Sequence, residues 1–200
     1  MVKETYSSEK ITVLKGLEAV RKRPAMYIGD VGKRGLHHLI YEIVDNSVDE
    51  FMAGYSSTVS VTIQEDGSVL VTDDGRGIPV DDHQTTGLTA LETVMTTLHA
   101  GGKFGGKAYA VSGGLHGVGA SVVNALSEWV KVSVYREDKI FRQEYSRGIT
   151  QTEMTSENNP DGKNSKTGTT IEFMPDTDIF SELVFDFAVL SNRFKEMAYL

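Results

Sequence analysis

One face of a single segment carries an acid, an amide and a second acid at helical spacing. In Leu36–Phe51 (LHHLIYEIVDNSVDEF), the residues Glu42, Asn46 and Asp49 fall within about 60° of one another on a helix. A carboxylate in such a position can act as a general base, and an amide oxygen is a suitable ligand for a hard cation. The same residues are also compatible with an ordinary solvated face of an amphipathic helix whose other face packs.

A third carboxylate, Asp73, stands at the end of a short β-branched run and just before two glycines. The sequence DDGRGIP follows Val69–Thr72, which has the pattern of a buried strand. A carboxylate at the end of such a strand can accept a hydrogen bond from an exocyclic amine such as that of adenine. Gly75 and Gly77 would let a flat ring approach the backbone, although a tight turn explains the same residues equally well.

A glycine-rich stretch from His99 to Gly119 (HAGGKFGGKAYAVSGGLHGVG) leads into a segment with helical spacing, Ala120–Leu126. Long runs of this kind in a compact domain are commonly lids or binding loops. Backbone N–H groups at a helix start bind anions, and Lys103 could add a positive charge for the outer phosphates. The glycine spacing matches neither the P-loop nor the dinucleotide-binding fingerprint, and a flexible surface loop is the alternative.

The elements that must hold these residues are helices and hairpins. We expect one domain of the α+β class over residues 11–200, preceded by a flexible arm at residues 1–10. Helical spacing predicts helices at Ile11–Arg23 (ended by Pro24), Leu36–Phe51, Leu88–Leu98, Ala120–Leu126 and Phe185–Leu200. Strand patterns predict a hairpin of Thr58–Ile63 with Val69–Thr72, a hairpin of Trp129–Tyr135 with Ile140–Tyr145, and a strand at Thr169–Phe173, with loops at Gly29–Gly35 and residues 151–168.

The composition narrows the class of protein. The chain has 200 residues, a net charge of −8 and no cysteine. Disulfides and thiolate metal sites are therefore excluded, and the sequence fits a cytoplasmic protein that has neither a signal peptide nor a membrane-spanning segment. A domain that grips DNA by itself should be basic, so the acidic charge argues against direct DNA binding. The last predicted helix runs to the end of the sequence, and we expect a piece of a longer protein.

Four blocks follow one another in a specific order. They are Glu-x-x-x-Asn on a helix, Asp-x-Gly-x-Gly after a strand, the glycine-rich stretch that enters a helix, and Thr-Gly-Thr at the start of a strand. In this order they resemble the nucleotide-binding boxes of the GHKL ATPases. The stretches RKRPAMYIG, EIVDNSVDE, DDGRGIP, LHAGGKF and VSGGLHGVGASVVNALS narrow the resemblance to the ATPase domains of the bacterial DNA gyrase B family. It extends from Ile11 onward, and the ATPase domain of topoisomerase IV, which belongs to its E subunit, is the near alternative.

The resemblance implies a fold, two cofactors and a set of catalytic roles. The fold would be a GHKL (Bergerat) sandwich, with a mixed, largely antiparallel sheet and helices packed on one face. The cofactors would be ATP and Mg²⁺. Glu42 would activate the attacking water as general base, His38 would orient Glu42, and Asn46 would hold Mg²⁺ through its amide oxygen.

The resemblance also implies the contacts to the nucleotide. Asp73 would read the adenine amine, helped by a water held by Thr169, and Tyr109 would lie over the ribose. Lys103 and the main chain of Leu115–Gly119 would cradle the phosphates. Glu50 would pair with Arg76 at the mouth of the pocket. The full set implied is Asn46, Glu50, Asp73, Arg76, Gly77, Ile78, Gly101, Gly102, Lys103, Tyr109, Gly114, Leu115, His116, Gly117, Val118, Gly119, Arg136 and Thr169.

For the whole protein, the resemblance implies an ATP-driven dimer gate that powers DNA strand passage and negative supercoiling. The partner would be DNA gyrase A in an A2B2 heterotetramer, with DNA contacted through the full enzyme and no membrane involved. In the family's dimers the N-terminal arm reaches the partner's site, which makes Tyr6 a candidate contact. The family's transducer and metal-binding cleavage domains are absent from this sequence, so we expect the fragment to bind ATP–Mg²⁺, hydrolyse it slowly and remain mostly monomeric.

Two positions depart from the family's pattern. Ala25 stands where relatives usually have glycine, and Ala110 stands where many have a lysine, a change that could weaken phosphate contacts. A further alternative is a GHKL module that binds nucleotide without hydrolysing it. The presence of Glu42 argues against that alternative, because sensing a nucleotide needs no general base.

Overall fold

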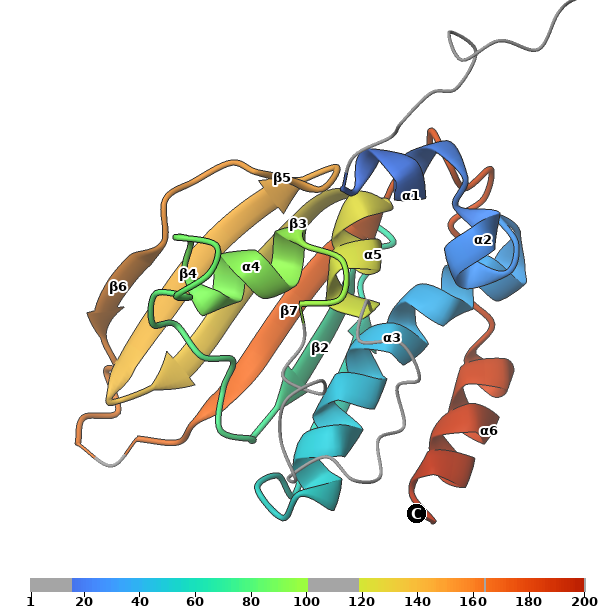
Figure 1. Ribbon diagram of the computed structural model, residues 1–200. Helices are drawn as coiled ribbons and strands as arrows, with labels where there is room; N and C mark the ends of the chain where they lie inside the picture. The colour runs from blue at the N-terminus through green and yellow to red at the C-terminus, as the bar shows by residue number, and fades with distance from the viewer. Residues whose placement is uncertain (1–15, 101–118, 164, 200) are drawn as a thin grey trace, which may run out of the picture.

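The computed structural model describes residues 16–100, 119–163 and 165–199, and within them one antiparallel sheet is covered by helices (Figure 1). The strand order is β1-β2-β7-β3-β4-β5, and β6 pairs with β4 beside β5. The strands of this sheet are β1 (Val59–Ile63), β2 (Val69–Asp73), β3 (Ser127–Arg136), β4 (Lys139–Ser146), β5 (Ile149–Thr150), β6 (Thr155–Asn158) and β7 (Gly168–Pro175).

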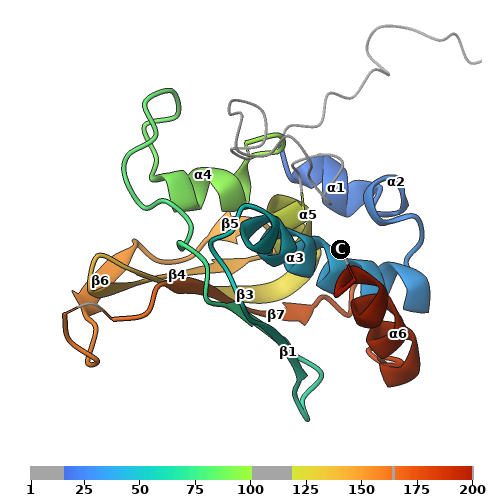
Figure 2. The same ribbon diagram turned by 90° about the horizontal axis from the view of Figure 1, so that it is seen from below.

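The helices lie on one face of the sheet, as Figure 2 shows from below. They are α1 (Glu18–Lys22), α2 (Ala25–Ile28), α3 (Lys33–Met52), α4 (Ala90–Thr96), α5 (Gly119–Ala125) and α6 (Phe187–Met197). The long helix α3 lies between α5 and α6, where Tyr41 of α3 meets Phe194 of α6 edge to face at 6.4 Å between ring centroids. The α+β class and the layered arrangement predicted from the sequence are confirmed.

Alternation along the strands explains where the core forms. On β3, Val130, Val132 and Val134 are buried, while the intervening side chains face the other side of the sheet. Val71 of β2 and Phe173 of β7 extend the same apolar layer beneath the helices. Both predicted hairpins are confirmed, and the second turns on Glu137 and Asp138, which have the positive φ angles of a two-residue turn.

The starts of the first helix and of the long helix differ from the prediction, and a short helix that was not predicted lies between them. Helix α3 begins at Lys33 rather than at Leu36, because the Asp30 carboxylate accepts hydrogen bonds from the N–H groups of Gly32 and Gly35 and satisfies the helix start. The first helix covers only Glu18–Lys22 of the described residues, since Gly16 has a φ of +56°. Pro24 ends that helix but also starts α2, a position that suits its fixed φ.

The segment 151–168 was expected to be a loop, but it contains strand β6. All four of its residues are exposed, so no apolar alternation marks it in the sequence. Its backbone instead pairs with the first half of β4, from Lys139 to Arg142. The strand is held by backbone hydrogen bonds at an edge, a kind of contact that leaves little trace in a sequence pattern.

A buried carboxylate fixes the C-terminal end of α5. Asp176 accepts hydrogen bonds from Arg21 and Arg147, both at 2.8 Å, and Arg21 also donates to the carbonyl of Ala125 at 2.7 Å. Burial acts to raise the pKa of Asp176, but hydrogen bonds from Arg147, Asp178 and Arg21 outweigh it and lower the pKa to about 2. Helix α1 is thereby tied to α5, whose other end lies at the candidate site.

No helix in the described ranges is both long and apolar enough to cross a membrane.

Candidate functional site

Asp73, at the end of β2, is held by donors from three parts of the chain. Ser47 of α3 donates its hydroxyl to Oδ2 at 2.8 Å, and the N–H groups of Gly75 and Thr169 donate to Oδ1 at 3.0 and 3.2 Å. Burial raises the pKa of the Asp73 carboxyl, and the three hydrogen bonds oppose this rise without cancelling it. Among the described residues Oδ2 accepts one hydrogen bond, which leaves it able to accept another.

The loop after Asp73 is fixed at both ends by Thr169. Thr169 donates its N–H to Asp73, and its hydroxyl accepts a hydrogen bond from the N–H of Ile78 at 3.3 Å. The preceding Gly168 lies so close that a Cβ there would fall 2.1 Å from the carbonyl oxygen of Asp73. The start of β7 therefore packs tightly against the end of β2, and the loop between Asp73 and Ile78 has little conformational freedom.

The two glycines of that loop are needed for packing against the protein itself. A Cβ at Gly75 would lie 3.0 Å from Oδ1 of Asp73 and 3.1 Å from Cγ of Glu50. Gly77 has a φ of +77°, and a Cβ there would lie 2.9 Å from Cγ1 of Val134. The glycines let the loop approach the sheet and α3, whereas their expected role of admitting a flat ring stays a prediction.

The expected Glu50–Arg76 ion pair is present. Arg76 donates from Nη2 to Oε1 of Glu50 at 2.8 Å and from Nε to Oε2 at 3.0 Å, and its backbone N–H also reaches Oε2. The guanidinium carbon lies 3.8 Å from the ring centroid of Tyr55, a contact that sequence reasoning missed. Arg136 of β3 donates from Nη1 to the carbonyl of Gly77 at 3.4 Å.

Glu42 and His38 form the second part of the site. They are one turn apart on α3, and Nε2 of His38 lies 3.0 Å from Oε1 of Glu42. The start of α5 lies against the same carboxylate, since a Cβ at Gly119 would fall 2.3 Å from Oε2 of Glu42. A carboxylate paired with a histidine thus stands beside the helix start at which the sequence predicts a phosphate site, and the roles of Glu42 as general base and His38 as its orienting partner stay predictions.

Helix α3 links the two parts. Glu42 and Ser47 are five residues apart, which corresponds to about 7.5 Å along the helix axis. Ser47 holds Asp73, Glu42 contacts the start of α5, and Asn46 lies between them in sequence. Asp49, which was expected on a polar face with Glu42 and Asn46, is only 2% exposed, so a solvated face is wrong at that position.

The remaining predicted site residues lie outside the described residues, and their roles stay predictions. The same holds for Tyr6 and the expected arm at residues 1–10. The site residues concerned are Gly101, Gly102, Lys103, Tyr109, Gly114, Leu115, His116, Gly117 and Val118.

The donor set is compatible with a magnesium ion bound mainly by phosphate and water. Within the described residues, no group of three or more His, Cys, Asp and Glu side chains could hold a metal ion. Mg²⁺ commonly binds to one or two protein oxygens together with substrate phosphates and water molecules. A single amide oxygen from Asn46 fits that pattern.

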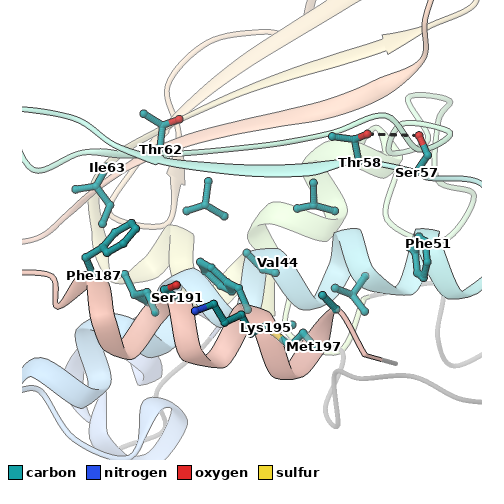
Figure 3. A pocket seen from close by; sticks show the side chains of 16 residues that line it. Val44, Phe51, Ser57, Thr58, Thr62, Ile63, Phe187, Ser191, Lys195 and Met197 are labelled. Atoms are coloured by element: carbon teal, nitrogen blue, oxygen red, sulfur yellow. Dashed lines mark hydrogen bonds between the residues drawn. The ribbon is translucent and has the colours of Figure 1, made fainter.

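A cavity of about 810 Å³ lies elsewhere, between β1, α3 and α6 (Figure 3). Phe187 of α6 and Ile63 of β1 lie together at one end of it, and Phe51 of α3 lies at the other. Its lining is mainly apolar and includes none of the site residues predicted from the sequence. The cavity is therefore separate from the candidate site.

Comparison with protein families agrees with this geometry. The sequence profile of the family described as "Histidine kinase-, DNA gyrase B-, and HSP90-like ATPase" matches residues 32–179. This range contains Glu42, Asn46, Asp73, Gly119 and Thr169.

Curated relatives are similar over nearly the whole chain. DNA gyrase B of Thermotoga maritima is 59% identical over 98% of this chain and 30% of the relative. DNA gyrase B of Synechocystis is 57% identical over 100% and 18%, and the B subunit of the type 2 topoisomerase of Aquifex aeolicus is 55% identical over 98% and 24%. The chain therefore spans less than a third of the length of these relatives.

A solved structure with the same fold is the 43K ATPase domain of Thermus thermophilus gyrase B in complex with an aminocoumarin. Its TM-score is 0.81 at 48% identity, and the match covers 94% of this chain and 46% of that chain. At this identity and coverage, the two chains share the same fold over most of this chain.

Proposed function

The chain belongs to the family of histidine kinase-, DNA gyrase B- and HSP90-like ATPases, and on this premise we propose that it binds and hydrolyses ATP along α3. Asp73 receives the adenine amine at one end, and the phosphates lie toward Glu42 and the start of α5 at the other. The observation that carries the proposal is that one helix, α3, positions both carboxylates. Glu42 is part of α3 and pairs there with His38, and Ser47 of α3 donates a hydrogen bond to Asp73.

At the purine end, recognition follows from the acceptor that remains on Asp73. Oδ2 already accepts the hydroxyl of Ser47, and a second lone pair can accept an exocyclic amine. A hydrogen bond to an ionised, half-buried carboxylate is stronger than one between neutral groups. The N–H of Ile78 donates to the hydroxyl of Thr169, which fixes the loop that follows Asp73.

At the phosphate end, Glu42 takes a proton from the attacking water. Nε2 of His38 contacts Oε1 of Glu42 and keeps the Glu42 side chain from rotating away. We propose that Asn46 supplies a protein oxygen to Mg²⁺, which when bound neutralises charge on the phosphates. These roles support a hydrolysing enzyme over a nucleotide sensor.

For the complete protein we propose the activity of a DNA gyrase B, an ATP-driven dimer gate for DNA strand passage in the cytoplasm. The relatives' names support a DNA gyrase B. We further propose DNA gyrase A as its partner, in an A2B2 assembly. The net charge of −8 favours DNA contact through other parts of the enzyme. We also propose that the purine site accepts an aminocoumarin, as the Thermus thermophilus structure holds one.

The purine assignment is tested by comparing ATP with ITP, in which a carbonyl replaces the exocyclic amine. Titration calorimetry on the fragment should show about ten- to hundredfold weaker binding of ITP, the range expected for losing a hydrogen bond to a charged group. Equal affinities would remove Asp73 from adenine recognition. A steady-state assay separates slow hydrolysis from pure binding.

The activity of the complete protein is tested with DNA gyrase A and plasmid DNA. ATP-dependent negative supercoiling of relaxed plasmid is expected. Decatenation without supercoiling would favour the topoisomerase IV alternative, and the absence of both would contradict a topoisomerase.

A further inference from the structure

Tyr55 follows α3 and contacts the residue at the centre of the Asp73–Ile78 loop. We propose that Tyr55 is a positioning residue, which orients Arg76 and thereby the Glu50–Arg76 ion pair beside the purine site. The inference rests on the proposed function, because it assigns Tyr55 to the same adenine pocket. Tyr55 itself need not touch the nucleotide.

The contacts of Arg76 use different parts of its guanidinium group. The edge formed by Nε and Nη2 donates to the two carboxylate oxygens of Glu50. The flat face lies on Tyr55, with 3.8 Å between the guanidinium carbon and the ring centroid. Because an arginine can pair in its plane and stack on its face at once, the two contacts together define both the direction and the tilt of the group.

The ion pair fixes the edge of the guanidinium but does not cover its face. The pair is bidentate, with the side chains of Arg76 and Glu50 42% and 18% exposed, so water can reach the flat face of the guanidinium unless another group covers it. An aromatic ring excludes water from one face of the guanidinium. Tyr55, which is itself 51% exposed, therefore adds a restraint on the tilt of Arg76 that pairing with Glu50 does not supply.

Tyr55 is held in place by the loop that it supports. Its N–H donates to the carbonyl of Glu50 at 2.9 Å, at the end of α3. The following residues wrap around Asp74, whose carboxylate accepts hydrogen bonds from the hydroxyl of Ser56 and from the N–H groups of Ser57 and Thr58 at 2.7–2.9 Å. Hydrogen bonds from Ser57, Thr58 and Ser56 hold the pKa of Asp74 far below its usual range, so it stays ionised.

Two neighbouring segments thus brace each other. Asp74 fixes the segment after Tyr55, and Tyr55 fixes Arg76, two residues after Asp74. Thr169 restrains the loop at Asp73 and Ile78, and Gly75 and Gly77 each contribute one backbone hydrogen bond between them. Arg76 adds the contact that ties this part of the loop to α3 through Glu50. Releasing Arg76 would loosen the part of the loop next to the adenine-reading carboxylate.

The test compares three substitutions of Tyr55 in the fragment: Tyr55→Leu, Tyr55→Phe and Tyr55→Trp. Calorimetry with adenosine and with a non-hydrolysable ATP analogue should show that Tyr55→Leu weakens both by the same factor, about two- to fivefold, the range for an exposed cation–π contact. Phe and Trp should retain wild-type affinity because the ring, and not the hydroxyl, makes the contact. In turnover assays Tyr55→Leu should raise KM and leave kcat unchanged.

Two controls make the result specific. Tyr199→Leu removes an aromatic ring that is 92% exposed and should change nothing. In an Arg76→Gln background, Tyr55→Leu should have no further effect, since the contact it removes is already lost. Additive losses, an equal loss in Tyr55→Phe, or unchanged affinity in Tyr55→Leu would each overturn the inference.

The failure of this inference is distinguishable from that of the proposed function. If Asp73→Asn weakens adenosine binding while the Tyr55 series is flat, only the role of Tyr55 is wrong. If adenosine does not bind to the wild-type fragment, the purine site itself is wrong. Thermal melting identifies a variant that fails to fold. If Tyr55→Leu is such a variant, Arg76→Gln alone decides, because it removes the same contact from the other side: weaker adenosine binding is expected, and unchanged affinity would overturn the inference.

Discussion

Asp73 and Glu42 are both carboxylates beside α3, but the protein treats them differently. Asp73 is fixed by donors from α3, from its own loop and from β7, and burial raises its pKa. Glu42 belongs to the helix itself and has a side chain that is 23% exposed, with one oxygen beside His38 and the other facing the start of α5. Asp73 is therefore held by hydrogen bonds from three segments, whereas Glu42 is oriented by one side-chain partner, His38.

This difference matches two different tasks. A group that recognises a base works best when it is rigid before the ligand arrives, because little ordering remains to be done on binding. A general base must meet a water molecule and accept a proton, which requires an accessible oxygen. We therefore expect changes at Asp73 to alter affinity and changes at Glu42 to alter turnover.

The largest expected effect is that of Glu42→Ala. Removal of the general base should lower kcat by about 10²- to 10⁴-fold while ATP binding is retained, because the carboxylate acts on water and not on the nucleotide. Steady-state assays and calorimetry measure the two quantities. Glu42→Gln keeps the side-chain shape and should show the same separation, and loss of binding in both variants would contradict the assignment.

The next effect is that of Asp73→Asn. The amide presents a donor to a site built from donors, so nucleotide affinity should fall by about ten- to hundredfold. Turnover at saturating ATP should change little, which is the reverse of the Glu42 result. Asp161→Asn, at an exposed position away from the site, is the matched control. If Asp73→Asn binds nucleotide as tightly as the wild type, Asp73 does not determine affinity and its proposed difference from Glu42 is wrong.

Gly119→Ala probes how closely α5 approaches Glu42. The added Cβ would fall 2.3 Å from Oε2 of Glu42, so the carboxylate must move. A displaced base should lower kcat by about tenfold, since misplacement of a reacting group by 1 Å has effects of about this order or larger. Gly32→Ala, whose Cβ would make only an ordinary 3.4 Å contact with Asp30, is the control at another helix start. Unchanged kcat would show that the approach of α5 does not position Glu42.

The purine end was the more predictable part of the site. Strand β2, its terminal Asp73 and helix α3 all follow from local periodicity, which a sequence displays directly. The Glu50–Arg76 pair follows from family resemblance and is present. What local patterns could not show is the set of donors around Asp73, because Ser47 and Thr169 come from segments that are 26 and 96 residues away.

The errors have a common physical origin. Helical spacing placed Asp49 on one face with Glu42 and Asn46, for which a solvated face was an alternative, yet Asp49 is buried. Strand β6 has no apolar alternation and is set by pairing with β4. Tyr55 looks like an isolated aromatic residue after a helix, and only the folding of the Asp74 segment brings it under Arg76. In each case the decisive contact joins segments that are not adjacent in sequence.

The smallest effect is on the pH dependence of binding. An amine donor favours the ionised form of Asp73, so a bound nucleotide should lower the pKa that burial raises in the free protein. Affinity should be constant near neutral pH and fall, by at most about tenfold per pH unit, once the pH drops below the pKa of the free carboxyl. Calorimetry in two buffers of different ionisation enthalpy detects the accompanying release of protons.

The stability of the unliganded fold should respond to the same carboxyl in the opposite direction. Because folding raises the pKa of Asp73, its contribution to stability is fully present below the unfolded pKa and is lost as the pH rises through the folded pKa. Asp176, whose pKa is lowered, acts in the other sense, so the informative quantity is the difference between wild type and Asp73→Asn. Relative to Asp73→Asn, the wild type should lose nucleotide affinity and gain free energy of unfolding as the pH is lowered. If affinity and stability instead change in the same direction, Asp73 is not the group that links them to pH.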